Sequence, residues 1–479
     1  MTLWITIIGI ALIAAIGMSG RTRATDVESW AVAERDIPRW TSWFLQAGES
    51  LTTFSFLGLA GIAFAGGSSA VFAVAYLSLS AVLLYFVAPR IRNLSIGKGY
   101  VTQADFLADR FRSRALGRVV AVVGALSLIP YLQLQITGLG LIVQLATGSE
   151  AARGLSMVIA SILVVVFVTR SGIRGIARVA YLKDILMVVA LLVVAGGVMI
   201  YVGGIPTVFR TVAQHDPVML TLHSPGYDTT FFVTAVIVTT LAAGFNTFPH
   251  LWPPVLAARS AEVLRSNYKW LALYQLALFL PIFIGFAAVL VLSPKTTANG
   301  ALLGVATHTL PDWLVGLVAV SGAAAAMVPS AAIAMGISTL VTRNLVTIRN
   351  PRTALRVNHG VVVLATVGAL AFGLKQSNIA DLLLITYGGL AQLIPAIAIG
   401  LCAKVRVGAV PVLLGAIAGI TSVIVITFAE VPLGSWDSGL VSLAPNLIVL
   451  VVAEALRRVF ANARDDVPEQ VAAPVVVAG

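Results

Sequence analysis

The sequence is poor in cysteine and in charge. It has a single cysteine, Cys402, among 479 residues, which excludes an internal disulfide and a cysteine-rich zinc or iron–sulfur site. Charged residues make up 11% of the chain and hydrophobic residues 59%. Soluble domains are about 25% charged. The composition is therefore that of an integral membrane protein.

Catalytic motifs are also missing. The sequence has no HExxH, no phosphate-binding Gly-Lys loop, no GxSxG and no calcium-binding loop. Its five histidines are scattered, and His250 lies within an apolar stretch. We therefore expect no enzyme, no cofactor and no metal centre. The Ala/Val-rich stretch 465–479 is too short for a soluble domain, and we expect it to be a disordered cytoplasmic tail.

Long apolar stretches predict an all-α membrane protein with thirteen transmembrane helices, each near the roughly 20 residues that a helix needs to cross a bilayer. The predicted spans are 2–19, 43–66, 68–89, 119–147, 154–169, 180–203, 230–257, 270–293, 312–341, 357–374, 378–403, 407–428 and 439–456.

The basic residues predict the orientation. With the N-terminus outside, 27 of the 31 lysines and arginines fall in or beside cytoplasmic segments, and the exceptions are Arg153, Arg210, Lys295 and Lys375. The positive-inside rule thus predicts a multi-pass protein of the inner (plasma) membrane with a cytoplasmic C-terminus. The net charge of +11 follows from this topology, so we expect a lipid bilayer and a small solute as partners, with no nucleic acid and no obligatory protein partner.

The second predicted span carries polar groups that are costly in hydrocarbon. Glu49 stands among Gly48, Ser50, Thr52 and Thr53 in a stretch that is otherwise apolar. Glycines weaken a continuous helix. We predict a broken helix there, although hydroxyls bonded to their own helix and an interfacial Glu49 are an alternative.

The seventh span is interrupted in a similar way. Thr240 and Gly244 precede Asn246, Thr247 and Pro249, where Asn246 or Thr247 could cap a second half-helix that Pro249 opens. An ordinary proline kink is the alternative.

The two interrupted spans lie five helices apart and so cross the membrane in opposite senses, as in an inverted repeat of five plus five helices. The predicted organisation is a first helix and loop (1–42), a first repeat (43–203), an extracellular loop (204–229), a second repeat (230–403), two C-terminal helices (404–464) and the tail (465–479).

Polar side chains of the broken and flanking spans predict a substrate cavity near the middle of the membrane. The candidate substrate-binding residues are Thr52, Thr53, Tyr131, Gln135, Thr240, Asn246, Tyr387 and Gln392. The sixth span begins with an adjacent Lys183 and Asp184, which are either an interfacial pair that snorkels or a functional pair inside the membrane.

These motifs resemble the sodium:solute symporter family. Residues 48–61 resemble its unwound first core helix, and GYVTQADFLADRF (99–111) resembles its cytoplasmic signature. The segments IPYLQLQ (129–135), YLKD (181–184), FPH (248–250) and MVPSA (327–331) are most similar to those of bacterial monocarboxylate permeases. The resemblance implies the LeuT-like inverted-repeat fold and transport by alternating access.

The resemblance also implies a sodium site, which this sequence alters. Main-chain carbonyls of Gly48 and Leu51 and the ninth span around Ala325, Val328 and Pro329 would form it. Sodium-dependent members have hydroxyl side chains where Val328 and Pro329 stand. Asp184 matches an acidic position of the family, but Lys183 replaces a small polar residue. Proton coupling through Glu49 or Lys183 thus becomes plausible, so the coupling ion is a proton or Na⁺.

From the resemblance we expect a symporter that imports a short monocarboxylate such as lactate, pyruvate or propionate, proton-coupled or independent of sodium. Half-helix N-termini, hydroxyls and amides would bind the anion, because no arginine lies deep in a predicted span. A sodium-coupled symporter of an amino acid such as proline is the alternative. A solute-gated sensor or channel is a more distant one.

Overall fold

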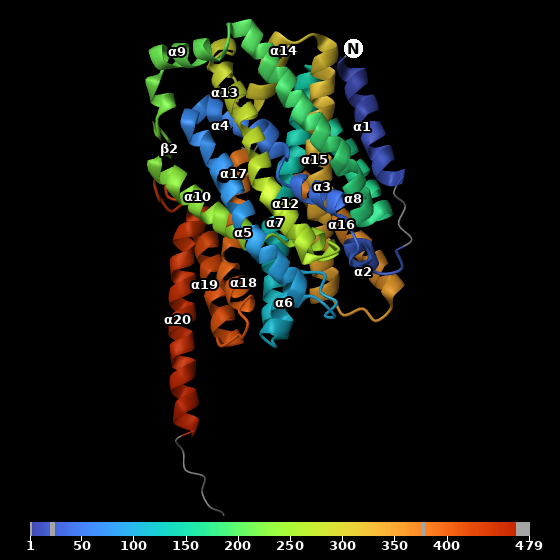
Figure 1. The fold of residues 1–479 in the computed structure, drawn as a ribbon, viewed down its shortest axis with the longest axis vertical. Coiled ribbons are helices and arrows are strands. Elements are labelled where there is room, and N and C mark those ends of the chain that lie inside the picture. The colour runs from blue at the N-terminus through green and yellow to red at the C-terminus, as the bar shows by residue number, and fades with distance from the viewer. Residues whose placement is uncertain (1, 20–23, 149, 375–378, 466–479) are drawn as a thin grey trace, which may run out of the picture.

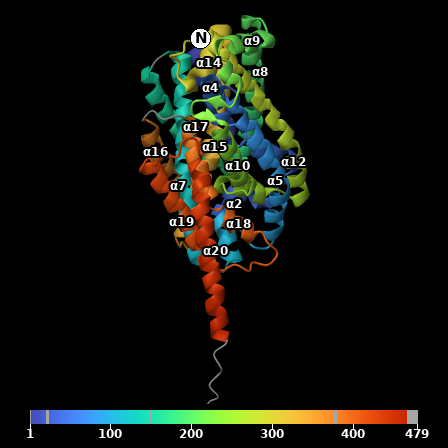
Figure 2. The ribbon, with the colours of Figure 1, turned by 90° about the vertical axis from the view of Figure 1, so that its left-hand side faces the viewer.

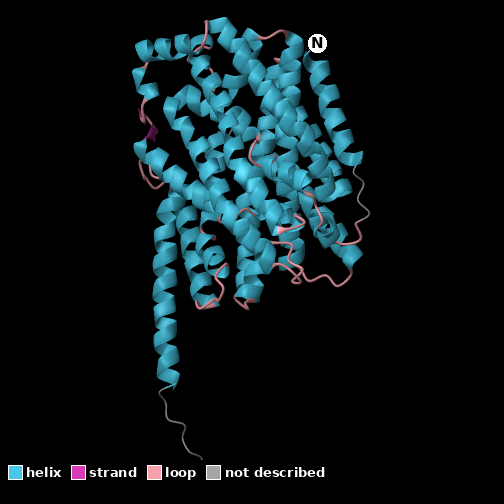
Figure 3. Cartoon of the chain, viewed as in Figure 1, coloured by secondary structure: helices cyan, strands magenta, loops and turns pink. Residues whose placement is uncertain are grey.

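The computed structural model describes residues 2–19, 24–148, 150–374 and 379–465, which are mostly helical (Figures 1 and 3). The first part of the chain forms α1 (Thr2–Ser19), α2 (Val27–Val32), η1 (Ala33–Arg35), α3 (Arg39–Ala47), η2 (Phe54–Gly58), α4 (Leu59–Gly66), η3 (Gly67–Val71), α5 (Phe72–Leu94), α6 (Gln103–Arg110), α7 (Arg114–Thr147) and α8 (Glu150–Val202).

A short hairpin of two paired strands interrupts the helices of the second part. This part forms α9 (Ile205–His215), η4 (Pro217–Leu220), β1 (His223–Ser224), β2 (Tyr227–Asp228), α10 (Thr229–Gly244), η5 (Pro249–Leu251), α11 (Trp252–Ala257), α12 (Ala261–Tyr274), η6 (Gln275–Leu278), α13 (Phe279–Val291), η7 (Ala298–Gly300), α14 (Ala301–Thr309), α15 (Asp312–Leu340), η8 (Val341–Leu345), α16 (Pro351–Gly373), α17 (Ile379–Ala391), α18 (Ile394–Gly400), α19 (Ala409–Phe428) and α20 (Ser438–Asp465).

The predicted all-α class is confirmed, and helices occupy every predicted span. Eight helices of the described chain are long and apolar enough to cross a bilayer, or ten if each of two bent pairs is one span. This count takes α8 as one helix, although Gly172 interrupts its helical backbone between the predicted fifth and sixth spans. The predicted tail lies outside the described residues from position 466 onward.

The breaks in the second and seventh spans are confirmed. In the second span α3 ends at Ala47, and helix resumes as a π-helical turn at Phe54. In the seventh span α10 ends at Gly244, and Pro249 opens the next helical turn after a bend of 42°. The capping role expected of Asn246 or Thr247 is wrong, because Phe248 holds the cap position and the Thr247 hydroxyl donates back to Ala242 O.

One further interruption was not predicted, and a second falls between the predicted fifth and sixth spans. The eleventh span bends by 46° between α17 and α18. The backbone of α8 departs from helix at Gly172, whose φ of 55° favours glycine. A Cβ at position 172 would lie 2.4 Å from the Trp30 carbonyl oxygen, so this glycine also lets α2 pack closely against α8.

The core of the molecule is α15, which packs against α1, α7, α8 and α16. Of its most apolar window 94% is buried, against 22% for α16. Its alanine run 323–326 and Gly322 present little bulk, so neighbouring helices can approach its backbone closely. Outer helices instead expose large apolar side chains, such as Leu364, Phe428 and Ile448, as expected for a surface that faces lipid.

One end of the bundle collects the positive charge, and we call it the basic end. It carries α2, α6 and the loop before α16 in the lower part of Figure 1. The 99–111 motif folds here into a capping box, in which Thr102 caps α6 and Asp105 reaches back to the Thr102 backbone. Asp105 also accepts from Asn344 Nδ2 at 2.7 Å and pairs with Arg343 at 3.1 Å, which ties α6 to the end of η8.

The two half-helices of the broken spans meet at the basic end. Ile37 N donates to Ala257 O at 2.9 Å, and Arg259 N donates to Ile37 O at 3.0 Å, which joins the start of α3 to the end of α11. Helix α20 runs alongside α19 and extends beyond the rest of the bundle (Figures 1 and 2).

Candidate functional site

The break in the second span faces a buried lysine of α8. Lys183 Nζ donates to the main-chain carbonyls of Gly48 and Leu51, the latter at 2.6 Å, and pairs with Asp184 Oδ1 at 2.9 Å. An ammonium has three hydrogens to donate, and two of them are used in these hydrogen bonds, whereas the contact with Asp184 is an ion pair without hydrogen-bond geometry. The side chains of Lys183 and Asp184 are 0% and 4% exposed. This pair lies well inside α8 and does not snorkel to the interface.

Gly48 lets the end of α3 pack closely against α8. A Cβ at position 48 would lie 2.7 Å from Phe44 O and 3.3 Å from the Ala180 Cβ. The glycine that weakens the helix in the sequence therefore also allows the close approach of the break to α8.

This arrangement does not fit a sodium ion. The carbonyls of Gly48 and Leu51, which the family resemblance assigns to sodium, are engaged by an ammonium. Ala325, Val328 and Pro329 are buried in α15, and their side chains contain no oxygen. The positive charge at this place belongs to the protein itself.

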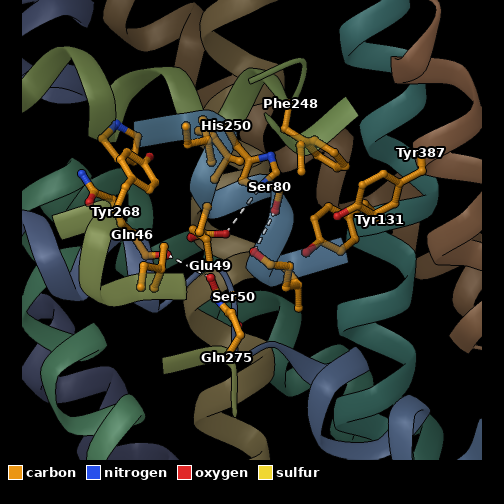
Figure 4. A pocket seen from close by; sticks show the side chains of 17 residues that line it. Gln46, Glu49, Ser50, Ser80, Tyr131, Phe248, His250, Tyr268, Gln275 and Tyr387 are labelled. Carbon is orange, nitrogen blue, oxygen red and sulfur yellow. Dashed lines mark hydrogen bonds and ion pairs between the residues drawn. The ribbon is translucent and has the colours of Figure 1, made fainter. Parts of the chain in front are cut away.

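A cavity of about 60 Å³ lies on the basic-end side of the two breaks (Figure 4). A single water needs roughly 10–15 Å³ of such space, so the cavity suits a few waters or a small solute. It is lined by Gln46, Glu49, Ser50, Leu77, Ser80, Ala81, Leu84, Tyr131, Ala243, Phe248, His250, Leu251, Pro254, Tyr268, Leu271, Gln275 and Tyr387.

Two facing groups, one from each broken span, occupy the centre of this lining. Glu49 Oε2 lies 3.3 Å from His250 Nε2, with side-chain exposures of 5% and 2%. Figure 4 shows the two side chains directed at each other across the cavity. Pro249 fixes the start of the turn that carries His250, so the proline that breaks the seventh span also positions the imidazole.

Aromatic rings form one wall of the cavity. The His250 ring packs against Tyr131 and Phe248 at centroid distances of 5.5 and 5.6 Å, and Phe248 packs against Tyr387 at 4.7 Å. Tyr131 comes from α7 and Tyr387 from α17, so this wall joins the broken helices to two other spans.

The structure brings together some of the predicted substrate-binding residues. Tyr131 and Tyr387 line the cavity, and the Tyr131 hydroxyl lies within hydrogen-bonding reach of the Thr52 side chain. Gln135 Oε1 accepts from the Thr53 backbone at 3.4 Å, so this glutamine supports the break.

Three other predicted residues do not line this cavity. Asn246 is fully buried at the seventh-span break, and its side-chain amide has no hydrogen-bond partner. The Thr240 hydroxyl also lacks one. Gln392 donates to Gly439 O at 2.9 Å and contacts Asn446, so it joins the α17–α18 bend to α20.

Sequence reasoning did not assign several lining residues, chiefly Gln46, His250, Tyr268 and Gln275. His250 lies within the predicted seventh span and Gln275 within the eighth, so each carried the signal of a polar group in hydrocarbon. Gln46 stands three residues before Glu49, a spacing that would place both on one face of an unbroken helix. What the sequence did not show is that α3 and η6 bring these amides to one cavity.

Comparisons with known proteins show the family of this chain. The family model described as "Sodium:solute symporter family" matches residues 30–419. The chain is 34% identical to the uncharacterized symporter YhjB of Bacillus subtilis (strain 168), over 89% of each protein. It is 25% identical to a monocarboxylate transport permease protein of Rhizobium johnstonii, over 66% of this chain and 64% of that protein.

Solved structures show the same fold. A Na⁺-coupled sialic acid symporter in a substrate-bound outward-open state superposes with a TM-score of 0.79 at 16% identity, over 95% of this chain and 98% of that one. Mhp1, a nucleobase-cation-symport-1 family transporter, superposes with a TM-score of 0.54 at 16% identity, over 90% and 94% of the two chains. The predicted LeuT-like architecture is thereby confirmed.

Proposed function

The chain belongs to the sodium:solute symporter family, and from this premise we propose that it imports a short monocarboxylate together with protons, without a need for sodium. Its family and fold are those of membrane transporters. The single observation that carries the proposal is the Lys183 ammonium, bonded to the carbonyls of Gly48 and Leu51.

A tethered ammonium removes the need for a sodium ion at this position. It supplies a positive charge to the break from within the chain, so binding of an external cation there is replaced by a permanent contact. Driving force must then come from another ion. Glu49 and Lys183 are the charged groups that face the break, so they are the candidates to carry the proton.

The cavity supports a small anionic solute that moves with a proton. Two tyrosines and His250 provide polar contacts, and none of the lining residues is a lysine or an arginine. An anion beside Glu49 would be repelled unless a proton balanced the added charge. A relative named as a monocarboxylate transport permease supports the same solute class.

Uptake of radiolabelled lactate, pyruvate and propionate into proteoliposomes tests the proposal. We expect an inward proton gradient alone to drive accumulation, and a sodium gradient at fixed pH and membrane potential to add nothing. Lys183→Gln should weaken pH-driven accumulation while leaving exchange partly intact. Uptake that requires the sodium gradient in the wild-type protein would contradict the proposal.

Two arms of this experiment address the alternatives. Labelled proline and alanine in the same vesicles test for an amino acid substrate. Counterflow against an unlabelled gradient tests for a carrier, because a channel cannot exchange labelled solute uphill.

We also propose that the basic end faces the cytoplasm. The charge distribution carries this proposal, because 27 of the 31 lysines and arginines lie in or beside the segments that are cytoplasmic in this orientation. A cysteine placed at Ser113 should be protected from an impermeant reagent added outside the cell, in a background lacking Cys402. Labelling from outside would reverse the orientation.

A further inference from the structure

The cavity holds three hydrogen-bond acceptors that no group of the described protein satisfies. They are Gln46 Oε1, Glu49 Oε2 and Gln275 Oε1. Their side chains come from α3, the second-span break and η6, and all three line the cavity in Figure 4. Gln46 is 5% and Gln275 is 1% exposed, so bulk water does not solvate these oxygens freely.

The serine hydroxyls that line the cavity already contact backbone carbonyls. The Ser80 hydroxyl donates to Leu77 O at 3.0 Å, and the Ser50 hydroxyl faces Gln46 O at 3.5 Å, so both serine hydroxyls are directed to their own backbone. Gln46 Nε2 donates to Ser42. The contact between Glu49 and His250 is an ion-pair approach that lacks hydrogen-bond geometry.

Buried acceptors without donors are costly unless a ligand or an ordered water satisfies them. Three such oxygens around one small cavity form a site for a group that donates hydrogen bonds. A charged carboxylate among them makes the contact stronger, because hydrogen bonds to an ionised acceptor are the strong ones. The site does not depend on the protonation of Glu49, since a protonated carboxyl keeps an acceptor oxygen.

We propose that Gln46, Glu49 and Gln275 form a donor-binding subsite that selects short acids with a hydroxyl or an ammonium beside the carboxylate. This inference rests on the proposed function, which supplies the carboxylate-bearing solute. The subsite holds the donor of the 2-substituent, while the tyrosine and histidine wall takes the rest of the molecule. An acid with no donor leaves the three oxygens unsatisfied and therefore binds more weakly.

A matched series of three-carbon acids tests the subsite. Propionate has no 2-substituent, pyruvate has an acceptor, lactate has one donor and alanine has three. Binding to the purified full-length protein in detergent, followed by intrinsic tryptophan fluorescence at one pH, gives a dissociation constant for each. We expect lactate, alanine or both to bind roughly tenfold to hundredfold more tightly than propionate and pyruvate. The lactate and alanine arms show which donor the subsite takes.

Variants link this preference to the three oxygens. Gln46→Met and Gln275→Met remove one acceptor each at similar side-chain length, and we expect them to reduce the preference for lactate or alanine while propionate binding is unchanged. Gln103→Met is the control, because Gln103 is an equally buried glutamine with an unpartnered amide that does not line the cavity. Retained propionate binding shows that each variant is folded.

The outcomes separate this inference from the proposed function. The proposed subsite is contradicted if propionate or pyruvate binds as tightly as lactate and alanine, or if lactate and alanine do not bind. It is also contradicted if the Gln46→Met/Gln275→Met double variant keeps the wild-type preference. A sodium requirement for uptake, with the preference intact, overturns the proposed coupling and leaves the subsite standing.

Discussion

The pair Lys183–Asp184 and the pair Glu49–His250 both lie against the break in the second span, but they differ in how fully they are hydrogen-bonded. The Lys183 ammonium donates two hydrogen bonds to main-chain carbonyls and lies 2.9 Å from Asp184 Oδ1, although the Asp184 carboxylate accepts no hydrogen bond. Glu49 and His250 approach to 3.3 Å, yet Glu49 Oε2 and His250 Nδ1 have no hydrogen bond.

This difference separates two roles for buried charge. The Lys183 ammonium bonds to two main-chain carbonyls of the break and therefore joins α8 to it. Glu49 and His250 face each other across a cavity with unpartnered polar atoms, which a ligand or an ordered water can satisfy. The first pair thus joins helices, whereas the second is available to a solute.

The largest effect is expected from Lys183→Met. The change leaves Asp184 buried without its partner and two carbonyls without a donor, which should cost about 3–5 kcal/mol of unfolding free energy and abolish uptake. Thermal unfolding of the detergent-solubilised protein measures the loss. The double variant Lys183→Met/Asp184→Leu is the control and should recover part of it, because no charge is stranded. Equal stability of the single and double variants would contradict a stabilising ion pair between Lys183 and Asp184.

His250→Phe should change transport more than stability. The ring packing against Tyr131 and Phe248 is kept, while the polar contact with Glu49 is lost. Uptake kinetics should show an apparent KM about tenfold to hundredfold higher for the monocarboxylate. A loss of stability as large as that of Lys183→Met would remove the contrast between the pairs.

Tyr131→Phe removes one hydroxyl from the cavity wall and retains the ring. The loss of a single neutral hydrogen bond, worth about 1 kcal/mol, should raise the apparent KM roughly fivefold. The same measurement on Tyr268→Phe tests whether the effect belongs to the Tyr131 side of the cavity. No change in KM for Tyr131→Phe would place the solute away from this wall.

Gln392→Met should have the smallest effect on transport. Its amide bonds to Gly439 O and contacts Asn446, away from the cavity, so the variant should lower the unfolding free energy by about 1–3 kcal/mol with an unchanged KM. Comparison with Gln275→Met under identical conditions shows the difference between a helix-joining amide and a cavity amide. A raised KM would indicate that Gln392 binds substrate, as predicted from the sequence.

Much of the fold could be predicted because its signals are local. Glycine at 48 and proline at 249 weaken a helix locally, so both breaks followed from the sequence. The run of apolar residues in α15 predicted a helix, and its small residues predicted close packing. The bend between α17 and α18 was not predicted, although Gly388, Gly389 and Pro395 stand beside it.

The site was predicted less completely, and Gln392 and Gln275 show why. Both are glutamines in apolar spans and have the same cost in hydrocarbon. One joins two helices and the other lines the cavity, and the difference lies in the direction that each side chain takes around its helix. Hydropathy predicts how deep a residue lies in the membrane, whereas the direction of its side chain depends on the helices that pack against it.

The sequence alone determined that this chain spans a membrane with two broken helices, because hydrophobic length, glycine and proline act on the segment that contains them. It also placed Lys183 beside Asp184 within an apolar span. Only the tertiary structure decided that Lys183 reaches the carbonyls of Gly48 and Leu51, and that Gln46, Glu49 and Gln275 share one cavity. These contacts join residues far apart in the chain, and they exist because helix packing brings distant side chains within hydrogen-bonding distance.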